Sequence, residues 1–189
     1  MNRDPHSWAR ALDSLRAEIW RRLKRGVQDR RAPARHPTLA TVSAQGLPQQ
    51  RTVVLRAADE GAATLRVYTD LHSGKIADLR ASPVAAMHVW DKAAHLQMRL
   101  HARVSILTGE EVGHIWAQLP EAARLSYGSN PAPGAVLDDA LAYEKCPREA
   151  AFAVLHLELQ DMDILHLGPQ HRRARYRRAD GWQGQWCAP

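Results

Sequence analysis

The chain has 189 residues, 45% of them hydrophobic and 24% charged, a composition that suits one globular domain with its own hydrophobic core. Its formal net charge is +6, but the basic residues are spread along the chain without a groove-reading motif, which argues against a nucleic-acid partner. No apolar run approaches the ~20 residues that span a bilayer, and acidic residues interrupt the N-terminus where a secretory signal would be apolar, so we expect a cytoplasmic protein without a membrane partner.

The N-terminal segment, residues 1–28, has the pattern of an amphipathic helix. Its large apolar residues recur every three or four positions: Trp8, Leu12, Leu15, Ile19 and Leu23. Ser7 is placed to cap the start of this helix, and Gly26 is placed to end it. A basic linker that contains proline follows, and the later segments have strand patterns. We therefore expect a single domain, 1–189, in which a helix precedes a β-rich unit formed by residues 36–189.

Alternating apolar and polar residues predict the strands of this unit. The expected strands are 38–44, 49–57, 63–70, 84–91, 95–107, 151–159, 164–167, 172–178 and 182–186. A helix is expected over 73–83, a second helix opens with a capping box from Thr108 to Glu111, and a brief helix is expected over 140–147. Most successive strands are joined by short turns rather than by regularly alternating helices. The pattern therefore favours a mainly β fold, an antiparallel barrel with peripheral helices, over a parallel doubly wound sheet.

Two cations lie where this fold would bring them to the rim of the barrel. Arg51 starts the strand 49–57, and Ser73, Gly74 and Lys75 open the helix that follows the strand 63–70. Free N–H groups, the helix dipole, a hydroxyl and an ammonium all favour an anion at such a helix start. The Arg51 guanidinium could contact the same phosphate with two hydrogen bonds. Taken singly, the cations would usually be solvated surface charges, and Ser73 alone would be a helix cap.

Other side chains add one candidate and exclude two kinds of site. The amide of Gln97, on the strand 95–107, can both donate and accept, as contact with the edge of a heteroaromatic ring requires. The ten histidines include no HExxH motif and no cluster with ligand spacing, so no metal site is expected. Cys146 and Cys187 are far apart in sequence, and free thiols are expected.

The order and spacing of several motifs resemble the pyridoxamine 5′-phosphate oxidase superfamily over residues 36–189. These motifs are RTVVLR, YTDLHSGK, SPVAAMHVW, LQMRLHARV, a helix that ends in WAQLP, and a terminal W…CAP. The resemblance implies an FMN-binding split β-barrel that forms a homodimer, with the flavin at the subunit interface. It also implies that the following residues contact FMN: Arg51, Thr52, Val53, Val54, Leu55, Arg56, Tyr68, Thr69, Ser73, Gly74, Lys75, Gln97 and Arg173. Gly74 stands where the family's phosphate motif has arginine. His171 is the best candidate for a catalytic acid or base.

The departures from the family lie on the substrate side. The positions at which the family's oxidases hold pyridoxal phosphate with Tyr, Arg and Ser carry Ile115, Leu119 and Ala123, and the Arg before the family's His becomes Pro169. A phosphorylated substrate needs cations or donors to replace its hydration, and these side chains offer none. We therefore expect an FMN-dependent oxidoreductase with a divergent pocket and an unidentified small-molecule substrate. A non-enzymatic module that binds flavin or haem on the same barrel is the alternative that the sequence leaves open.

Overall fold

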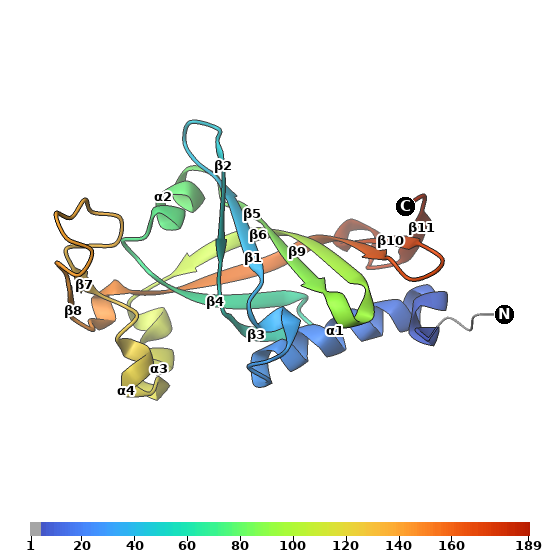
Figure 1. Ribbon diagram of the computed structural model, residues 1–189, viewed down its shortest axis with the longest axis horizontal. Coiled ribbons are helices and arrows are strands. Elements are labelled where there is room, and N and C mark those ends of the chain that lie inside the picture. The colour runs from blue at the N-terminus through green and yellow to red at the C-terminus, as the bar shows by residue number, and fades with distance from the viewer. Residues whose placement is uncertain (1–4) are drawn as a thin grey trace.

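The computed structural model describes residues 5–189, so residues 1–4 of the expected N-terminal helix lie outside the described part of the chain. Figure 1 shows a strongly curved sheet with helices around it. The strands are β1 (Thr38–Val42), β2 (Pro48–Thr52), β3 (Leu55–Asp59), β4 (Thr64–Asp70), β5 (Val84–Asp91), β6 (Leu96–Leu107), β7 (Ser129–Asn130), β8 (Glu144–Lys145), β9 (Phe152–His166), β10 (Arg172–Arg177) and β11 (Gly184–Cys187). The helices are α1 (Leu12–Gln28), α2 (Gly74–Ala81), α3 (Glu110–Gln118) and α4 (Glu121–Arg124), with 3-10 turns η1 (Ser7–Arg10), η2 (Pro33–Arg35), η3 (Lys92–Ala94), η4 (Glu149–Ala151) and η5 (Arg178–Asp180).

The main sheet has nine strands in the order β11-β10-β9-β6-β5-β1-β2, with β4 pairing with both β9 and β3. Every pair is antiparallel, which confirms the expected mainly β architecture. No pairing joins β2 to β3, so the sheet curls without closing. The fold is therefore a barrel that is open along one seam, a split barrel.

The seam lies inside the segment that was expected to form one strand, 49–57. The chain leaves the ladder with β1 at Thr52 and joins β4 at Leu55, with a bulge at Arg56. Between the two strands, the Val53 N–H donates to the Pro37 carbonyl at 3.0 Å. The prediction of a single strand was wrong because the segment changes partners within three residues, which an alternation pattern does not reveal.

Strand β9 is continuous, although its sequence predicted two strands, 151–159 and 164–167. Leu157 and Leu159 are buried, and beyond them Met162 and Ile164 are buried, so the phase of the alternation changes from odd to even positions. The change comes from a bulge: His101 of β6 pairs with Asp161 and Ala102 pairs with Leu159, so that Gln160 has no partner. A bulge adds one residue without ending the strand, and this explains the incorrect division.

The N-terminal helix packs along the barrel (Figure 1). It begins at Leu12, after η1, rather than at Ser7, and it continues through Gly26 to Gln28. Leu15 and Ile19 are among the residues that it buries in the core. The expected stop at Gly26 was wrong, because this glycine serves packing: a Cβ there would lie 2.7 Å from the carbonyl carbon of Ala34.

Two smaller predictions also need correction. Helix α3 has Gly109, at φ 59°, as its N-cap in place of Thr108, although the Thr108 N–H still lies 3.4 Å from Glu111 Oε2. The segment 140–147 contains β8 rather than a brief helix. The strand β8 pairs with β7, and the Cys146 N–H continues this pairing by donating to the Gly128 carbonyl at 3.0 Å. These hydrogen bonds use backbone groups that a helix would need.

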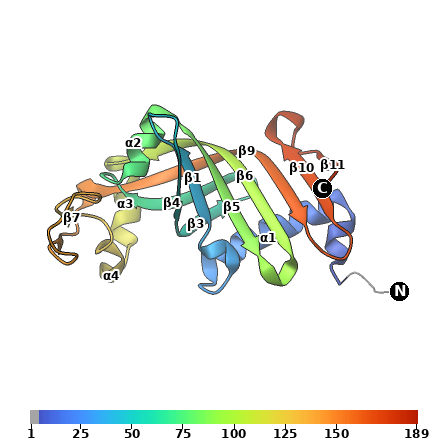
Figure 2. The ribbon, with the colours of Figure 1, turned by 45° about the horizontal axis from the view of Figure 1, so that its top comes forward.

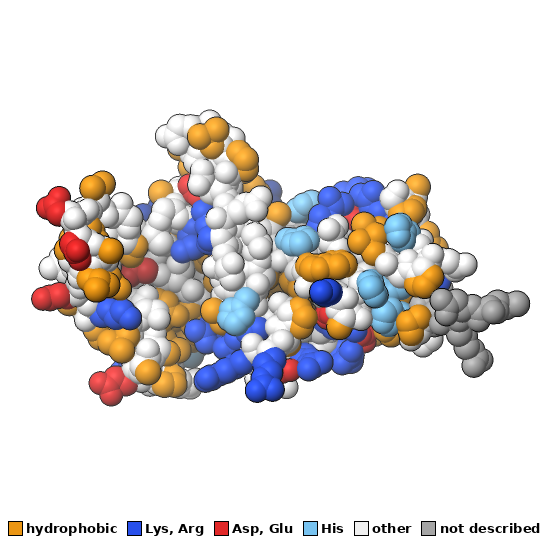
Figure 3. Space-filling model, viewed as in Figure 1, with side chains coloured by type: hydrophobic (Ala, Val, Ile, Leu, Met, Phe, Trp, Pro, Cys, Tyr) orange, Lys and Arg blue, Asp and Glu red, His pale blue; other side chains and the backbone are white. Residues whose placement is uncertain are grey.

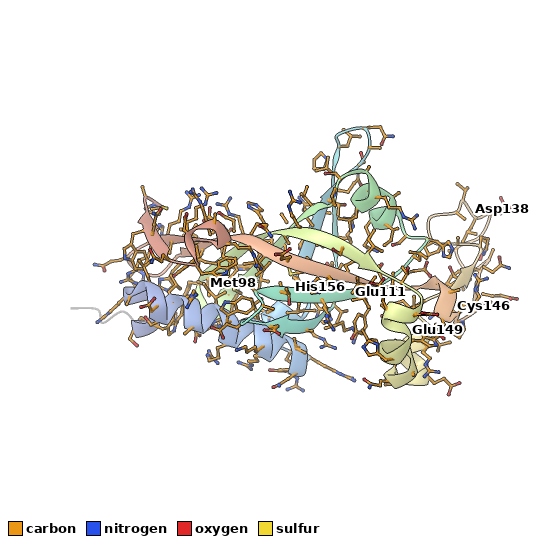
Figure 4. All side chains as sticks on the ribbon, turned by 180° about the vertical axis from the view of Figure 1, so that it is seen from behind. Met98, Glu111, Asp138, Cys146, Glu149 and His156 are labelled. Atoms are coloured by element: carbon orange, nitrogen blue, oxygen red, sulfur yellow. The ribbon has the colours of Figure 1, made fainter. Side chains whose placement is uncertain are left out.

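Within residues 5–189, no helix has the length and apolar character that crossing a membrane would require. Both cysteines are free. Figure 4 places Cys146 near the end of the molecule opposite the N-terminal part of α1.

Candidate functional site

Strand β2 presents Arg51 to helix α2. Its guanidinium donates to Thr41 Oγ1 at 2.5 Å and to Asp78 Oδ2 at 3.3 Å. The Thr41 hydroxyl donates to the same carboxylate oxygen of Asp78 at 2.6 Å. Asp78 is buried on α2 and Thr41 is buried on β1, so both hold the arginine from rigid elements. The guanidinium is therefore fixed beside α2 rather than free in solvent.

The start of α2 contributes a second cation to the same place. Lys75 Nζ donates to Thr69 Oγ1 at 2.8 Å and to Ser73 Oγ at 3.0 Å. The Ser73 hydroxyl donates to the Asp70 carbonyl at 2.7 Å and does not cap the helix. The ammonium thus folds back over the helix N-terminus, where the first N–H groups of any helix lack intrahelical partners.

The groups around Lys75 act on its pKa in both directions. Burial, and next the positive charge of Arg51, lower the pKa of Lys75, while Asp70 and Asp78 act in the opposite direction. Asp78 already accepts from Arg51, and Asp70 accepts the N–H groups of His72 at 2.7 Å and Gly128 at 2.6 Å. Two like charges and a helix N-terminus therefore meet, which is an environment that stabilises an anion.

This group of residues fits a phosphate ester. The Thr69 and Ser73 hydroxyls lie 3.2 Å apart beside Lys75, and Gly74 is exposed. A Cβ at Gly74 would meet no heavy atom within 4 Å, so the backbone here does not require glycine. We name Arg51, Thr69, Ser73 and Lys75 the α2 cation site.

The rest of the segment 51–56 leads away from the α2 cation site. Thr52 is exposed, Val53 and Leu55 are buried and Val54 is half-buried. Arg56 lies with its guanidinium 5.5 Å from the centre of the Tyr68 ring. Tyr68 packs edge-on against Phe152 at 5.3 Å between ring centres, on the opposite face of β4 from Thr69. Arg56 and Tyr68 therefore form a separate group on the α3 side.

Gln97 and Arg173 lie together elsewhere on the sheet. Both pair in register with Leu165 of β9, so their side chains share one face. The Arg173 guanidinium makes two hydrogen bonds to Asp163, at 3.0 and 2.8 Å. His171 is exposed just before β10. We name Gln97, His171 and Arg173 the β10 group.

One copy of the chain does not bring the β10 group to the α2 cation site. Arg51 is in register with Leu39, Leu39 with Met87, and Met87 with Leu100, so Arg51 shares the face of the buried Leu100. Gln97 is an odd number of residues from Leu100 on β6 and faces the other side. Figures 1 and 2 both show α2 and β10 toward different ends of β9.

The sequence reasoning missed Thr41 and Asp78, which position Arg51. Nothing in their local sequence marks them, because the contact joins residues 37 positions apart in the chain. Among residues 5–189, no three histidine, cysteine, aspartate or glutamate side chains are grouped so that they could hold a metal ion.

Comparison with known proteins places the chain among proteins of related sequence and fold. Residues 17–108 match the family model described as pyridoxamine 5′-phosphate oxidase, FMN-binding domain. The pyridoxine/pyridoxamine 5′-phosphate oxidase of Microcystis aeruginosa is 33% identical over 109 residues, which are 57% of this chain and 50% of that protein. The chain thus matches about half the length of such relatives.

Solved structures extend the similarity to nearly the whole chain. A pyridoxamine 5′-phosphate oxidase-related, FMN binding protein from Nostoc punctiforme aligns with a TM-score of 0.74 and 27% identity, covering 92% of this chain and 96% of that one. PhzG from Burkholderia lata, solved in complex with tetrahydrophenazine-1-carboxylic acid, aligns with a TM-score of 0.73 and 19% identity over 92% of this chain and 91% of its own. At that identity, PhzG shows the shared fold alone.

Proposed function

Because this chain belongs to the pyridoxamine 5′-phosphate oxidase-like FMN-binding split-barrel superfamily, we propose that it binds FMN and acts as a flavin-dependent oxidoreductase on a small-molecule substrate. The observation that carries this proposal is the α2 cation site, where Lys75 and Arg51 are close enough for Arg51 to lower the pKa of Lys75. A phosphate would offset the repulsion between the two cations and accept hydrogen bonds from both.

The residues of the chain divide the work of holding the cofactor. Arg51, Thr69, Ser73 and Lys75 would hold the phosphate, with Lys75 kept protonated by the bound anion. Gln97 would contact the edge of the ring, and the backbone of 52–54 would lie along it. When bound, the flavin supplies the redox chemistry, and the protein supplies position and exclusion of water. His171 is the candidate to donate or accept a proton at its imidazole nitrogens.

We further propose that the site is shared by two copies of the chain. The β10 group and the α2 cation site lie on opposite faces of the sheet, so each would be completed by the other copy. A hollow of about 430 Å³ over β1, β5 and β6 supports such an interface. It is lined mostly by apolar residues, which include the exposed side chains of Val42 and Val84. Contiguous exposed apolar surface of this kind is typical of interaction sites.

Subunit mixing tests the shared site. An Arg51→Ala/Lys75→Ala variant and a Gln97→Ala/Arg173→Ala variant should each bind FMN poorly. In a shared site, an equilibrated equal mixture contains heterodimers that have one intact site each. About one quarter of the wild-type FMN capacity should then return, since half of the dimers are mixed. No recovery in a mixture that gel filtration and mass spectrometry show to contain heterodimers would contradict the shared site.

The absorbance spectrum of the purified protein tests the main proposal. A flavin spectrum, with release of a compound of the mass of FMN, is the expected result, and a colourless protein that takes up no added FMN would refute it. Anaerobic addition of NAD(P)H or candidate amines, followed by oxygen, then tests turnover. A flavin that is reduced and reoxidised supports the oxidoreductase, whereas a tightly bound flavin that no donor reduces favours a storage or sensing module.

A further inference from the structure

Three histidines meet at the end of the barrel where the N-terminal segment reaches β9 and β10. His6 precedes η1, His95 follows η3 in the turn between β5 and β6, and His166 is the last residue of β9. The centre of the His6 ring lies 5.1 Å from that of His166 and 6.2 Å from that of His95. Figure 3 shows several histidine side chains at this end of the molecule. We name His6 together with η1 the N-terminal arm.

His6 and His166 share a hydrogen bond between their rings. The Nδ1 atom of His6 lies 3.0 Å from the Nε2 atom of His166, so one nitrogen donates and the other accepts. The accepting nitrogen must carry no proton. The hydrogen bond therefore survives when one of the two rings becomes an imidazolium, and it is lost when both do. Imidazoles gain protons between about pH 8 and pH 5, so this change falls in a mildly acidic range.

The N-terminal arm forms part of the cover over His166, which is fully buried. Trp8 of the arm packs edge-on against the His166 ring, with 5.3 Å between the ring centres. From the other direction Gly168 leaves room for the ring, since a Cβ there would lie 2.5 Å from His166 Cε1. A charged ring in such a place loses its hydration. Protonation of His166 therefore favours departure of the arm, which lets water reach the ring.

Within residues 5–189, the charged and titratable groups that face this pair from the neighbouring elements are mostly basic. They are Arg22 of α1, His95 after η3 and Arg172 of β10, which is directly opposite His166 in the ladder. The Arg22 guanidinium lies 5.4 Å from the centre of the Trp8 ring and pairs with both Glu18 and Asp91. A second proton on the pair would thus be added where cations already lie, and like charges disfavour it.

Other charges on these elements act elsewhere. Asp13 and Arg16 of α1 act on Tyr176, whose pKa is raised chiefly by burial. The ion pair of Asp163 and Arg173 lies on the opposite face of the sheet, and Lys92 of η3 is exposed. The response of the arm to pH therefore depends mainly on the two rings that share the hydrogen bond.

His166 also lies on the strands that carry the β10 group. It pairs in register with Leu96 of β6 on one side and with Arg172 of β10 on the other. Leu96 directly precedes Gln97, and Arg172 directly precedes Arg173. Successive side chains of a strand point to opposite faces, so the histidine pair lies behind the β10 group on the same three strands. A change at His166 therefore reaches Gln97 and Arg173 through a single residue of backbone.

We propose that His6 and His166 form a pH-dependent latch, which holds the N-terminal arm on the barrel while at most one of the two rings is protonated and releases the arm when both are. The latch is closed at about pH 7.5 and opens toward about pH 5. Release uncovers His166 and loosens the strand ends next to the β10 group. The release itself does not depend on FMN, whereas its effect on flavin affinity rests on the proposed function.

Hydrogen exchange of the full chain, followed by mass spectrometry, tests the latch. Peptides from the segment 6–15 report on the arm, where the Ala9 N–H donates to the His6 carbonyl at 3.0 Å. After correction for the intrinsic effect of pH on exchange, their protection should fall about tenfold or more between about pH 7.5 and about pH 5. Peptides from β9 should stay protected, which shows that the barrel remains folded.

Two histidine variants separate the latch from a general effect of acid. His6→Gln should keep the arm protected at both pH values, because glutamine can hydrogen-bond to His166 and gains no proton. His114→Gln is the matched control, since it changes an exposed histidine of α3, and it should lose protection as wild type does. Equal protection of the wild-type arm at both pH values, or the same loss in His6→Gln as in wild type, would overturn the inference.

A second measurement covers the case in which His6→Gln leaves the arm unprotected at both pH values. NMR titration of the histidine imidazoles in the wild-type chain then decides, with the His6 signals identified by their absence from the variant. Release that coincides with protonation of the second ring of the pair supports the latch. Release at a pH where neither His6 nor His166 titrates would overturn it.

Titration of FMN at the same two pH values tests the link to the β10 group. If about one tenth of the wild-type molecules keep the arm docked at about pH 5, the Kd for FMN should rise about tenfold from its value at about pH 7.5. His6→Gln should remove most of this rise. Release of the arm with no change in FMN affinity would refute the link to the β10 group. If the protein takes up no FMN at all, the proposed function fails, and hydrogen exchange still decides whether the latch exists.

Discussion

The α2 cation site leads to a prediction that separates the phosphate of FMN from its ring. In the variant Arg51→Ala/Lys75→Ala, the phosphate loses both cations. Riboflavin has the same ring and no phosphate, so its affinity should change less than about threefold, because hydrogen bonds and packing at the ring are retained. FMN affinity should fall strongly. The comparison between the two ligands is internal, and a general loss of folding cannot imitate it.

The size of the effect follows from the contacts. Hydrogen bonds to charged groups contribute about 1.5–3 kcal/mol each, so two such contacts give about 3–6 kcal/mol. In the free protein, Lys75 is partly desolvated and faces Arg51, and removal of both side chains also removes this unfavourable interaction. The loss should therefore lie near the lower end, about 3 kcal/mol, which corresponds to a Kd about 150-fold higher.

The assay is equilibrium titration of flavin fluorescence with the apoprotein, for both ligands. Arg80→Ala is the matched control, since Arg80 is an exposed residue in the last turn of the same helix. It should leave both affinities unchanged, and circular dichroism should show that the double variant keeps its secondary structure. Equal losses of FMN and riboflavin affinity in the double variant would show that the phosphate is bound elsewhere.

The remaining predictions concern pH and packing. FMN binding should weaken as the pH rises through the lowered pKa of Lys75, because the protonated amine binds the phosphate. The bound anion raises the pKa of Lys75, so the protein should take up protons when FMN binds in this pH range. Calorimetry in buffers of different ionisation enthalpy should detect this proton uptake. Lys75→Arg should flatten this profile, and an unchanged profile would contradict the role of the lysine. Gly26→Ala should destabilise the protein by about 1–2 kcal/mol in urea unfolding. Helix propensity alone predicts a gain of about 1 kcal/mol, so a more stable variant would refute the close contact with Ala34.

Local patterns in the sequence were sufficient to predict most of the strands. Period-two alternation placed β1, β4, β5 and β6 close to their observed bounds, and turn residues separated them. The expectation that Arg51 and Lys75 would lie near each other rested on a strand start and a helix start, but Arg51 is the last residue but one of β2, and its contacts with Thr41 and Asp78 bring it beside α2. The mainly antiparallel fold followed from the same patterns.

The features that the sequence patterns could not predict depend on contacts between residues that are distant in the chain. Asp78 looks like an ordinary helix residue until β1 is folded against it. The separation of Gln97 from Arg51 was implicit in the alternation, but only the register across β1, β5 and β6 shows that they occupy opposite faces. Gly26 was misinterpreted for the same reason, since Ala34, which packs against it, lies in the 3-10 turn η2 beyond the end of the helix.

The bulge at Gln160 affects which insertions and deletions β9 can tolerate in related chains. On its C-terminal side, Asp161 and Asp163 face the arginines of β6 and β10, while Met162 faces the core. Because Gln160 is the extra residue, deleting it would restore a regular alternation and leave these faces unchanged, whereas one further inserted residue would exchange the faces and turn two carboxylates toward the core. Insertions should therefore accumulate in the loops, whereas in this strand the loss of one residue can be absorbed at the bulge without a change in β6.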